Sequence, residues 1–215
     1  MPRRPKPTQA TVALFVRHGV TATTGKVLPG RARGLHLAES GVHQAERAGE
    51  RIAELKRVDA IYTSPLERAR ETAAPIAKAT GLKPKVERGL LECDFGDWTG
   101  AELPKLMKLP EWHTVQRAPS TFRFPNGESF TEMQVRIVST LDRLRARHHG
   151  GTIVCVSHAD PIKAAMAHAL GTHLDLFQRI VISTCSISAI GFAGDGPMAL
   201  TVNSTGGTLS DLVPS

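Results

Sequence analysis

The chain has 215 residues, of which 41% are hydrophobic and 22% are charged, values typical of a globular domain rather than of a disordered or fibrous protein. No apolar run approaches the roughly 20 residues that cross a bilayer, so we expect no membrane-spanning segment. The formal net charge of +7 suits an anionic ligand and is equally consistent with a role in solubility alone. A nucleic-acid partner is not expected, because aromatic residues make up only 5% of the chain and are not interleaved with the arginines.

The two ends of the chain differ in composition from its body. Residues 1–10 combine prolines with basic residues and predict a flexible basic arm, and residues 204–215 predict a flexible tail rich in glycine, serine and threonine. Residues 11–203 are then a single domain. The apolar stretch at 11–16 is too short for the core of a secretory signal, and the three cysteines are an odd number in apolar surroundings. We therefore expect reduced thiols and a cytoplasmic protein.

Strand and helix patterns alternate along the chain. Short apolar runs predict strands at 11–16, 60–63, 152–156, 187–192 and 199–203. Apolar residues at helical spacing predict helices at 42–55, from Pro65 to Gly81, from the capping box Ser129–Glu132 to Gly150, and from Asp160, as N-cap before Pro161, to Gly171. Pro75 should kink or split the second helix. The alternation predicts an α/β fold in three layers, α/β/α, around a mostly parallel sheet.

Residues 82–128 are less regular and contain several prolines. Their composition predicts an insertion, at about 101–128, that covers one face of the domain rather than forming a second one. The sequence Gly191–Gly196 resembles a dinucleotide-binding glycine box, but a proline and a strand follow where such a box needs a helix. We therefore interpret it as a turn.

Polar side chains follow three of the predicted strands. Arg17 and His18 follow the first strand, Arg68 comes shortly after the second, and His158 follows the third. Because ligands of parallel sheets bind beyond the carboxyl ends of the strands, we expect these side chains to converge with helix N-termini on an anion site. Each residue alone has an ordinary alternative, such as a histidine satisfied by backbone groups or an arginine on a solvated helix face.

Six motifs occur in a fixed order over roughly residues 11–190. They are Arg17-His18-Gly19, Gly41-Val-His-Gln44-Ala45, Ser64-Pro65-Leu66-Glu-Arg68-Ala69, Leu91-Glu92 through Phe95-Gly96-Asp97-Trp98-Thr99-Gly100, Pro125-Asn-Gly127-Glu128-Ser129 and Ser157-His158. In this order they resemble the histidine phosphatase superfamily, also called phosphoglycerate mutase-like. The resemblance is closest to a phosphatase-type branch with actinobacterial members. It implies the three-layer α/β/α fold of that superfamily.

The resemblance also implies a role for five residues. His18 is the nucleophile that carries the phosphoryl group as phosphohistidine, and His158 is the second histidine that donates to the transferred group. Arg17 and Arg68 bind phosphate, because planar guanidinium groups match its oxygens. Glu92 is the general acid and base.

Further candidates are weaker. Arg31, Thr21 and the backbone amide of Ala159 are candidate substrate-binding groups, although a surface role for Arg31 remains open. Asp94 and Asp97 are rivals of Glu92. Ala159-Asp160 stands where the superfamily usually has Gly-Gly. We expect no cofactor and no metal, because no residues have metal-ligand spacing.

The resemblance implies a metal-independent phosphoric monoester hydrolase of the histidine acid phosphatase type that acts on a small phosphorylated metabolite and releases inorganic phosphate. One alternative is a phosphomutase, which protects its phosphoenzyme from water and returns the group to a second hydroxyl. The other is a phosphate-ligand-binding protein with weak catalysis, against which the retention of all five residues argues. Edge strands could pair two copies in a homodimer, and no sequence feature decides this.

Overall fold

The computed structural model describes residues 10–193 and 196–206. Within these ranges six strands form one sheet in the order β3-β2-β4-β1-β5-β6. The strands are β1 (Thr11–Arg17), β2 (Ala60–Thr63), β3 (Lys85–Val86), β4 (Thr152–Ser157), β5 (Ile187–Ala193) and β6 (Gly196–Ser204). The pairings of β3 with β2, of β2 with β4 and of β4 with β1 are parallel. Strand β5 pairs antiparallel with β1 on one side and with β6 on the other. The expected mostly parallel sheet is confirmed.

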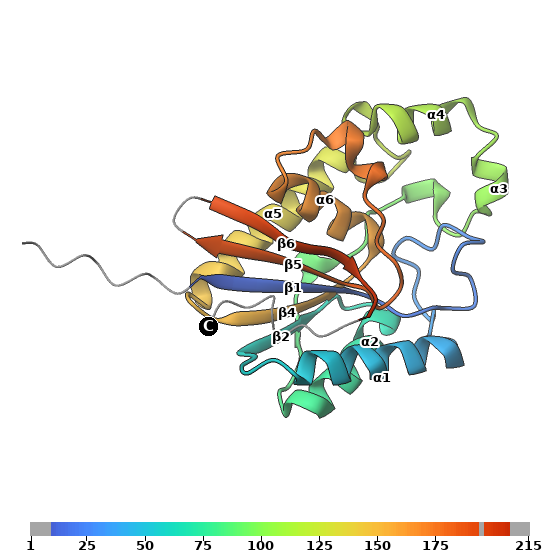
Figure 1. The fold of residues 1–215 in the computed structure, drawn as a ribbon. Helices are drawn as coiled ribbons and strands as arrows, with labels where there is room; N and C mark the ends of the chain where they lie inside the picture. Colours follow the sequence, from blue (N-terminus) through green and yellow to red (C-terminus); the bar gives the residue numbers. More distant parts are fainter. Residues whose placement is uncertain (1–9, 194–195, 207–215) are drawn as a thin grey trace, which may run out of the picture.

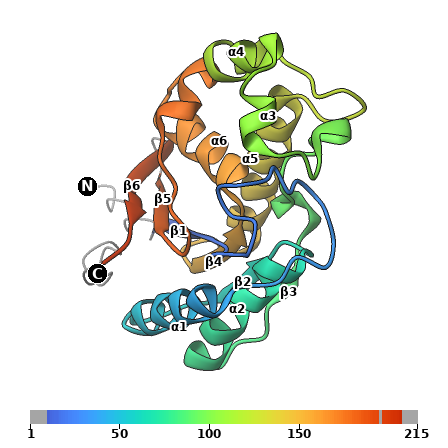
Figure 2. The ribbon, with the colours of Figure 1, turned by 90° about the vertical axis from the view of Figure 1, so that its right-hand side faces the viewer.

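Helices cover both faces of this sheet, as Figures 1 and 2 show. One face carries α1 (Glu39–Ala53) and α2 (Glu67–Thr80), and the other carries α5 (Phe130–Arg147) and α6 (Ala159–Ala169). Shorter helices are α3 (Leu103–Leu106) and α4 (Pro110–Arg117), with 3₁₀ turns η1 (Arg88–Leu90), η2 (Gly96–Trp98), η3 (Pro119–Thr121) and η4 (Leu174–Arg179). The three-layer α/β/α class is therefore confirmed.

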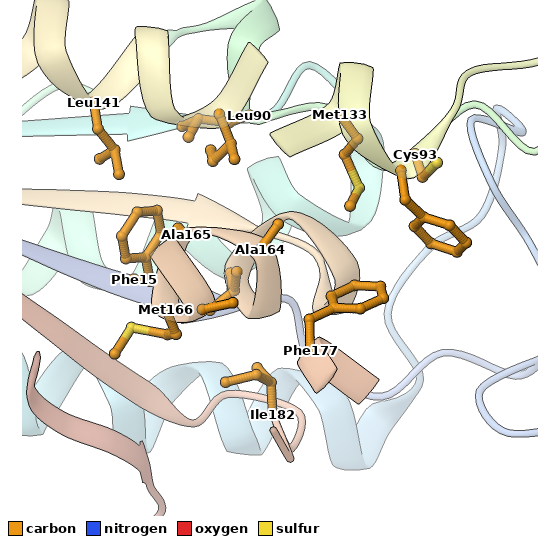
Figure 3. Close-up of a cluster of buried hydrophobic side chains, with 14 of the residues drawn as sticks. Phe15, Leu90, Cys93, Met133, Leu141, Ala164, Ala165, Met166, Phe177 and Ile182 are labelled. Carbon is orange, nitrogen blue, oxygen red and sulfur yellow. The ribbon is translucent and has the colours of Figure 1, made fainter. Parts of the chain in front are cut away.

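Alternation along β1 divides the core in two. Val12, Leu14 and Val16 belong to the hydrophobic cluster that packs against α1 and α2, whereas Ala13 and Phe15 belong to the cluster on the side of α5 and α6. Figure 3 shows part of the second cluster, with Phe15 beside α6. Strand β1 is therefore buried on both faces in the middle of the sheet. Its carboxyl end gives the residues that follow it, beginning with His18, a fixed position.

Two predicted helix starts are wrong by two residues. Helix α2 begins at Glu67, after an extended Leu66 at the N-cap, and α6 begins at Ala159 with His158 at the N-cap. The side chain of Asp160 does not cap α6 but lies 3.4 Å from Lys163 Nζ. Both helices follow their strands so closely that the β–α turn, rather than the proline or a capping side chain, sets where they begin.

The expectation for Pro75 is wrong where it predicts a split, since α2 runs unbroken through it. At this point α2 packs closely on α1, and a Cβ on Gly49 would lie 3.0 Å from the carbonyl of Pro75. The capping box of α5 is confirmed, because Ser129 Oγ accepts from the Glu132 amide and Glu132 accepts from the Ser129 amide. The two late strands are also confirmed, and β6 begins at Gly196.

Residues 101–128 hold α3, α4 and η3, which lie toward the carboxyl-end side of the sheet in Figure 1. The division into an arm at 1–10, a domain at 11–203 and a tail at 204–215 stays a prediction, and residues 1–9 and 207–215 lie outside the described residues. No helix in the described ranges combines the length and the apolar composition that a membrane span needs.

Candidate active site

The order of the strands brings the three polar strand ends together. Strand β4 lies between β2 and β1, with Arg17 paired to Ser157 and Thr63 to Val156 at the ends of the parallel ladders. The segments that follow β1, β2 and β4 therefore leave the sheet side by side, near the N-termini of α2 and α6 (Figure 2). The convergence expected from the sequence is what the topology provides.

His18 is buried directly after β1, with 5% of its surface exposed. Its Nδ1 lies 2.8 Å from the carbonyl oxygen of Gly19, an acceptor, so Nδ1 carries the proton and donates. The lone pair is then on Nε2, to which Arg68 Nε donates at 3.3 Å. Burial, and after it the charge of Arg68, lowers the pKa of His18 from 6.5 to about 3. The ring is therefore neutral at physiological pH, with an unprotonated Nε2 that can act as a nucleophile.

The two arginines expected to bind phosphate each keep a donor without a protein partner. Arg68 is fully buried; its Nη2 donates to the Gly30 carbonyl at 2.7 Å, and its Nη1 has no partner. Arg17 donates from Nη1 to the Ile182 carbonyl at 2.6 Å, and its Nε has no partner. Burial lowers the pKa of both guanidinium groups, and the charge of Glu92 opposes it. Buried cations with unmet donors favour an anion at this place.

His158 lies beside His18. Its ring centroid lies 5.2 Å from that of His18, its Nε2 is 2.8 Å from Ser64 Oγ, and its Nδ1 has no partner. Burial, and after it the charge of Arg68, holds the pKa of His158 well below 6.5, so this ring is also neutral. If Ser64 donates to Nε2, the proton of the ring is on Nδ1 and is available to a ligand.

Unpaired polar atoms concentrate at this site. In the part of the chain that the structure describes, five buried side-chain polar atoms have no hydrogen-bond partner. Three of them are nitrogens of the residues just described: Arg17 Nε, Arg68 Nη1 and His158 Nδ1. Buried polar groups in native proteins are nearly always paired, so three unpaired nitrogens at one place indicate a site for a ligand rich in acceptor oxygens.

Glu92 follows η1 and is 6% exposed. Its Oε1 accepts from the Cys93 amide at 3.0 Å. Burial, and after it the charge of Asp160, raises the pKa of this carboxyl from 4.5 to about 7, while the charges of the site arginines oppose the shift. A carboxyl that is partly protonated near neutral pH can both give and take a proton, which is what a general acid and base needs.

The rival carboxylates have other partners. Asp94 pairs with Arg31 and accepts from the Gly96 amide at 3.1 Å, and Asp97 accepts from Asn126 Nδ2 at 3.0 Å. Neither is buried. This arrangement favours Glu92 among the acidic residues that the sequence offers.

The three weaker candidates, Thr21, Arg31 and Ala159, differ in their hydrogen-bond partners. The Thr21 hydroxyl lies 3.0 Å from that of Thr24, within its own loop. Arg31 directs its guanidinium to the Glu92 carbonyl, Asp94 and Glu128. Ala159 is the first residue of α6, where backbone amides are free of intrahelical partners. The substrate contacts assigned to these three residues stay predictions.

Several supporting residues carry no role in the sequence-based analysis. The Gly19 amide donates to Thr72 Oγ1 at 3.0 Å, and the Val20 amide donates to Gln44 Oε1 at 3.1 Å. A Cβ on Gly19 would lie 2.5 Å from the Gly41 carbonyl oxygen, so the loop after His18 sits directly on α1. Contact with this loop thus explains the motif around Gly41 and Gln44. The spacing of these residues in the sequence does not reveal that contact.

Within the described residues, no group of three or more histidine, cysteine, aspartate or glutamate side chains is arranged to hold a metal ion. The positive charge at this site is that of Arg17 and Arg68, which also carry two of the three unpaired nitrogens.

Known proteins share the sequence pattern and the fold of this chain. The model of the histidine phosphatase superfamily (branch 1) matches residues 13–205. A bifunctional protein of Mycobacterium tuberculosis is 32% identical over 204 residues, which is 91% of this chain and 54% of that protein; the chain thus spans about half the length of the first curated relatives it matches. Phosphoserine phosphatase 1 of Hydrogenobacter thermophilus is 34% identical over 166 residues, covering 75% of this chain and 78% of that protein. A solved structure of a mutant phosphoserine phosphatase from Entamoeba histolytica in complex with phosphoserine has a TM-score of 0.82 and 26% identity, and covers 91% of this chain and 98% of that one.

Proposed function

Because the chain belongs to the histidine phosphatase superfamily, we propose that it is a metal-independent phosphomonoesterase that works through a phosphohistidine on a small phosphorylated metabolite. The observation that carries the proposal is the set of three unpaired nitrogens, on Arg17, Arg68 and His158, beside the neutral Nε2 of His18. A phosphoryl group offers acceptor oxygens to the three nitrogens and an electrophilic phosphorus to the fourth.

In the first step, the lone pair of His18 Nε2 forms a bond to phosphorus while the bond from phosphorus to the ester oxygen breaks. Arg17 and Arg68 bind the equatorial oxygens as charge spreads over them. His158 donates from Nδ1 to the same group when the Ser64 hydroxyl occupies Nε2. The leaving alkoxide takes the proton of the Glu92 carboxyl, so an alcohol departs and Glu92 is left ionised.

In the second step, ionised Glu92 takes a proton from a water molecule whose oxygen attacks phosphorus. The bond to His18 Nε2 breaks, inorganic phosphate is released, and Glu92 is again protonated. The raised pKa of Glu92 suits both directions of transfer, because neither protonation state is rare near pH 7.

The substrate is proposed to be a small phosphate ester. Two relatives support this class: their names describe phosphoserine phosphatases, and one is in complex with phosphoserine. We place the protein in the cytoplasm, since its three cysteines are buried and free of disulfide bonds. A homodimer stays a prediction.

The test is phosphate release from p-nitrophenyl phosphate in excess chelator by the wild type and by His18→Ala. We expect turnover by the wild type, with a burst of nitrophenol and an acid-labile phosphoenzyme, and neither in the variant. Turnover that survives in His18→Ala would refute the phosphohistidine route. A phosphoenzyme that forms but resists water, and passes its group to an added alcohol, would favour the phosphomutase.

A further inference from the structure

Two arginines hold the main chain of the segment that carries Glu92. Arg31 Nε donates to the Glu92 carbonyl at 2.9 Å, and Arg136 Nη2 donates to the same oxygen at 3.3 Å. Arg136 Nη1 also donates to the carbonyls of Leu91 and Gly89, each at 2.9 Å. The backbone from 89 to 92 is therefore fixed from two directions, by a loop residue and by α5.

Glu128 joins these two arginines. Its Oε2 accepts from Arg31 Nη2 at 3.0 Å and from Arg136 Nη2 at 2.9 Å, while its Oε1 accepts from Arg136 Nε at 2.8 Å. Asp94 closes the group: its Oδ2 pairs with Arg31 Nη1 at 3.1 Å, and its amide donates to Glu128 Oε2 at 3.2 Å. We call Arg31, Asp94, Glu128 and Arg136 the ion-pair quartet.

The quartet contacts the Glu92 backbone without adding net charge to the site. Two guanidinium groups face two carboxylates, so the formal charges cancel, and the pKa of Glu92 is shifted by burial and by the charges of Asp160, Arg68 and Arg17. The side chain of Glu128 is only 14% exposed, where ion pairs and hydrogen bonds are screened less than at the surface.

The surrounding backbone gives the quartet a rigid base. The Glu128 amide donates to the Asp94 carbonyl at 2.8 Å, and a Cβ on Gly127 would lie 2.5 Å from that oxygen. Leu90 and Cys93, on either side of Glu92, are buried in the core cluster together with Met133 of α5 (Figure 3). Burial of Leu90 and Cys93 and the hydrogen bonds of the quartet therefore both oppose a shift of the Glu92 backbone.

We propose that the ion-pair quartet is a positioning device that holds Glu92 in reach of the leaving-group oxygen, and that Arg31 serves in it rather than in binding phosphate. The inference rests on the proposed function, in which Glu92 is the general acid. Proton transfer needs heavy atoms within roughly 2.6–3.2 Å, and a misplacement of about 1 Å can cost roughly 100-fold in rate. Arg31 suits this role because Nε, Nη1 and Nη2 each donate to an acceptor in the Glu92 segment or the quartet.

The test compares two esters with opposite needs for a general acid, p-nitrophenyl phosphate and an alkyl phosphate such as glycerol phosphate. In Glu128→Gln, we expect kcat/KM for the alkyl ester, which reports the step in which Glu92 acts as an acid, to fall roughly 10- to 100-fold. For the aryl ester, whose leaving group needs no proton, kcat/KM should change by less than about threefold. Rates are divided by the burst amplitude, so that only folded and active sites are counted. Because Arg31 lies in a loop, Arg31→Lys is a second, milder variant that should show the same selectivity.

Two comparisons separate positioning from a structural role. Asp59→Asn is the matched control, because Asp59 has a 17% exposed side chain, pairs with Arg57 and accepts from the Thr152 amide at 2.8 Å at the opposite end of the sheet. It should change the rates with both esters equally. The double variant Glu92→Gln/Glu128→Gln should be no slower with the alkyl ester than Glu92→Gln alone.

The inference is overturned if Glu128→Gln and Arg31→Lys lower kcat/KM for both esters alike, if the double variant shows additive losses, or if Arg31→Lys weakens inhibition by inorganic phosphate more than about threefold. The last result would return Arg31 to the substrate-binding group. A wild type without His18-dependent turnover would refute the proposed function itself. That outcome differs from all three others, each of which requires an active wild type.

Discussion

The raised pKa of Glu92 predicts a specific pH profile for ester hydrolysis. A carboxyl with its ordinary pKa of 4.5 would be protonated in about one molecule in 300 at pH 7, whereas the pKa of about 7 leaves about half protonated. His18, with its pKa near 3, stays neutral throughout this range. For an alkyl phosphate, kcat/KM should therefore be nearly independent of Glu92 ionisation below pH 7 and fall about tenfold per pH unit above it.

The perturbation is Glu92→Gln, which keeps the shape of the side chain and removes its proton. The alkyl phosphate should lose roughly 100- to 10,000-fold in kcat/KM, and the limb near pH 7 should disappear. Ionisation of the substrate is the same for both enzymes, so the ratio of the two profiles isolates Glu92. The assay is initial phosphate release between about pH 4 and pH 9.

Asp160→Asn tests the cause of the raised pKa. After burial, the charge of Asp160 is what raises the pKa of Glu92, so its removal should move the limb to lower pH while kcat on the low-pH plateau is kept. A limb near pH 7 that persists in Glu92→Gln would show that another group donates the proton, and the reasoning from burial and charge would fail.

Three further outcomes follow from the same geometry. Arg68→Ala should weaken inhibition by inorganic phosphate or vanadate roughly 10- to 150-fold, from about 1.5–3 kcal/mol for a charge-assisted hydrogen bond, and unchanged inhibition constants would contradict the phosphate contact. Ser64→Ala should lower kcat while the folded state is kept, because His158 loses the partner of Nε2; a kcat equal to the wild type would show that this hydrogen bond does not matter. The pKa of His18 is lowered on folding, so the stability tied to its neutral form is complete above about pH 6.5 and is lost as pH falls toward 3, at up to about 1.4 kcal/mol per unit. The free energy of unfolding of His18→Ala, measured with denaturant, should therefore fall less steeply with decreasing pH than that of the wild type. Equal pH slopes of the two proteins would contradict this expectation.

The sequence was sufficient for the features that arise from local pattern and general topology. The apolar runs before His18 and His158 predict strands, and the rule for parallel sheets brings their ends together. The structure adds the strand order, with β4 between β1 and β2, which makes the three ends neighbours. The helix starts were less predictable, because the extended backbone of Leu66 and His158 ends each turn without a capping side chain.

The ion-pair quartet was beyond sequence-based reasoning for a different reason. Arg31 and Glu128 lie 97 residues apart, and Arg136 meets the Glu92 carbonyl across 44 residues. No periodicity links such positions. The motif around Glu128 was visible in the sequence, but its contacts depend on how α5 packs against the segment before it, which only the folded chain defines.

The four arginines near the site show why side-chain type alone does not assign a role. Arg17 and Arg68 each keep a buried nitrogen without a protein acceptor, whereas Nε and both terminal nitrogens of Arg31 and Arg136 have acceptors within 3.3 Å. A buried donor that the protein leaves unmet is costly unless a ligand meets it. Arg136, in contrast, makes five hydrogen bonds to the protein, and Arg31 makes three. The first pair therefore suits binding of a phosphoryl group, and the second suits holding the acid that acts on it.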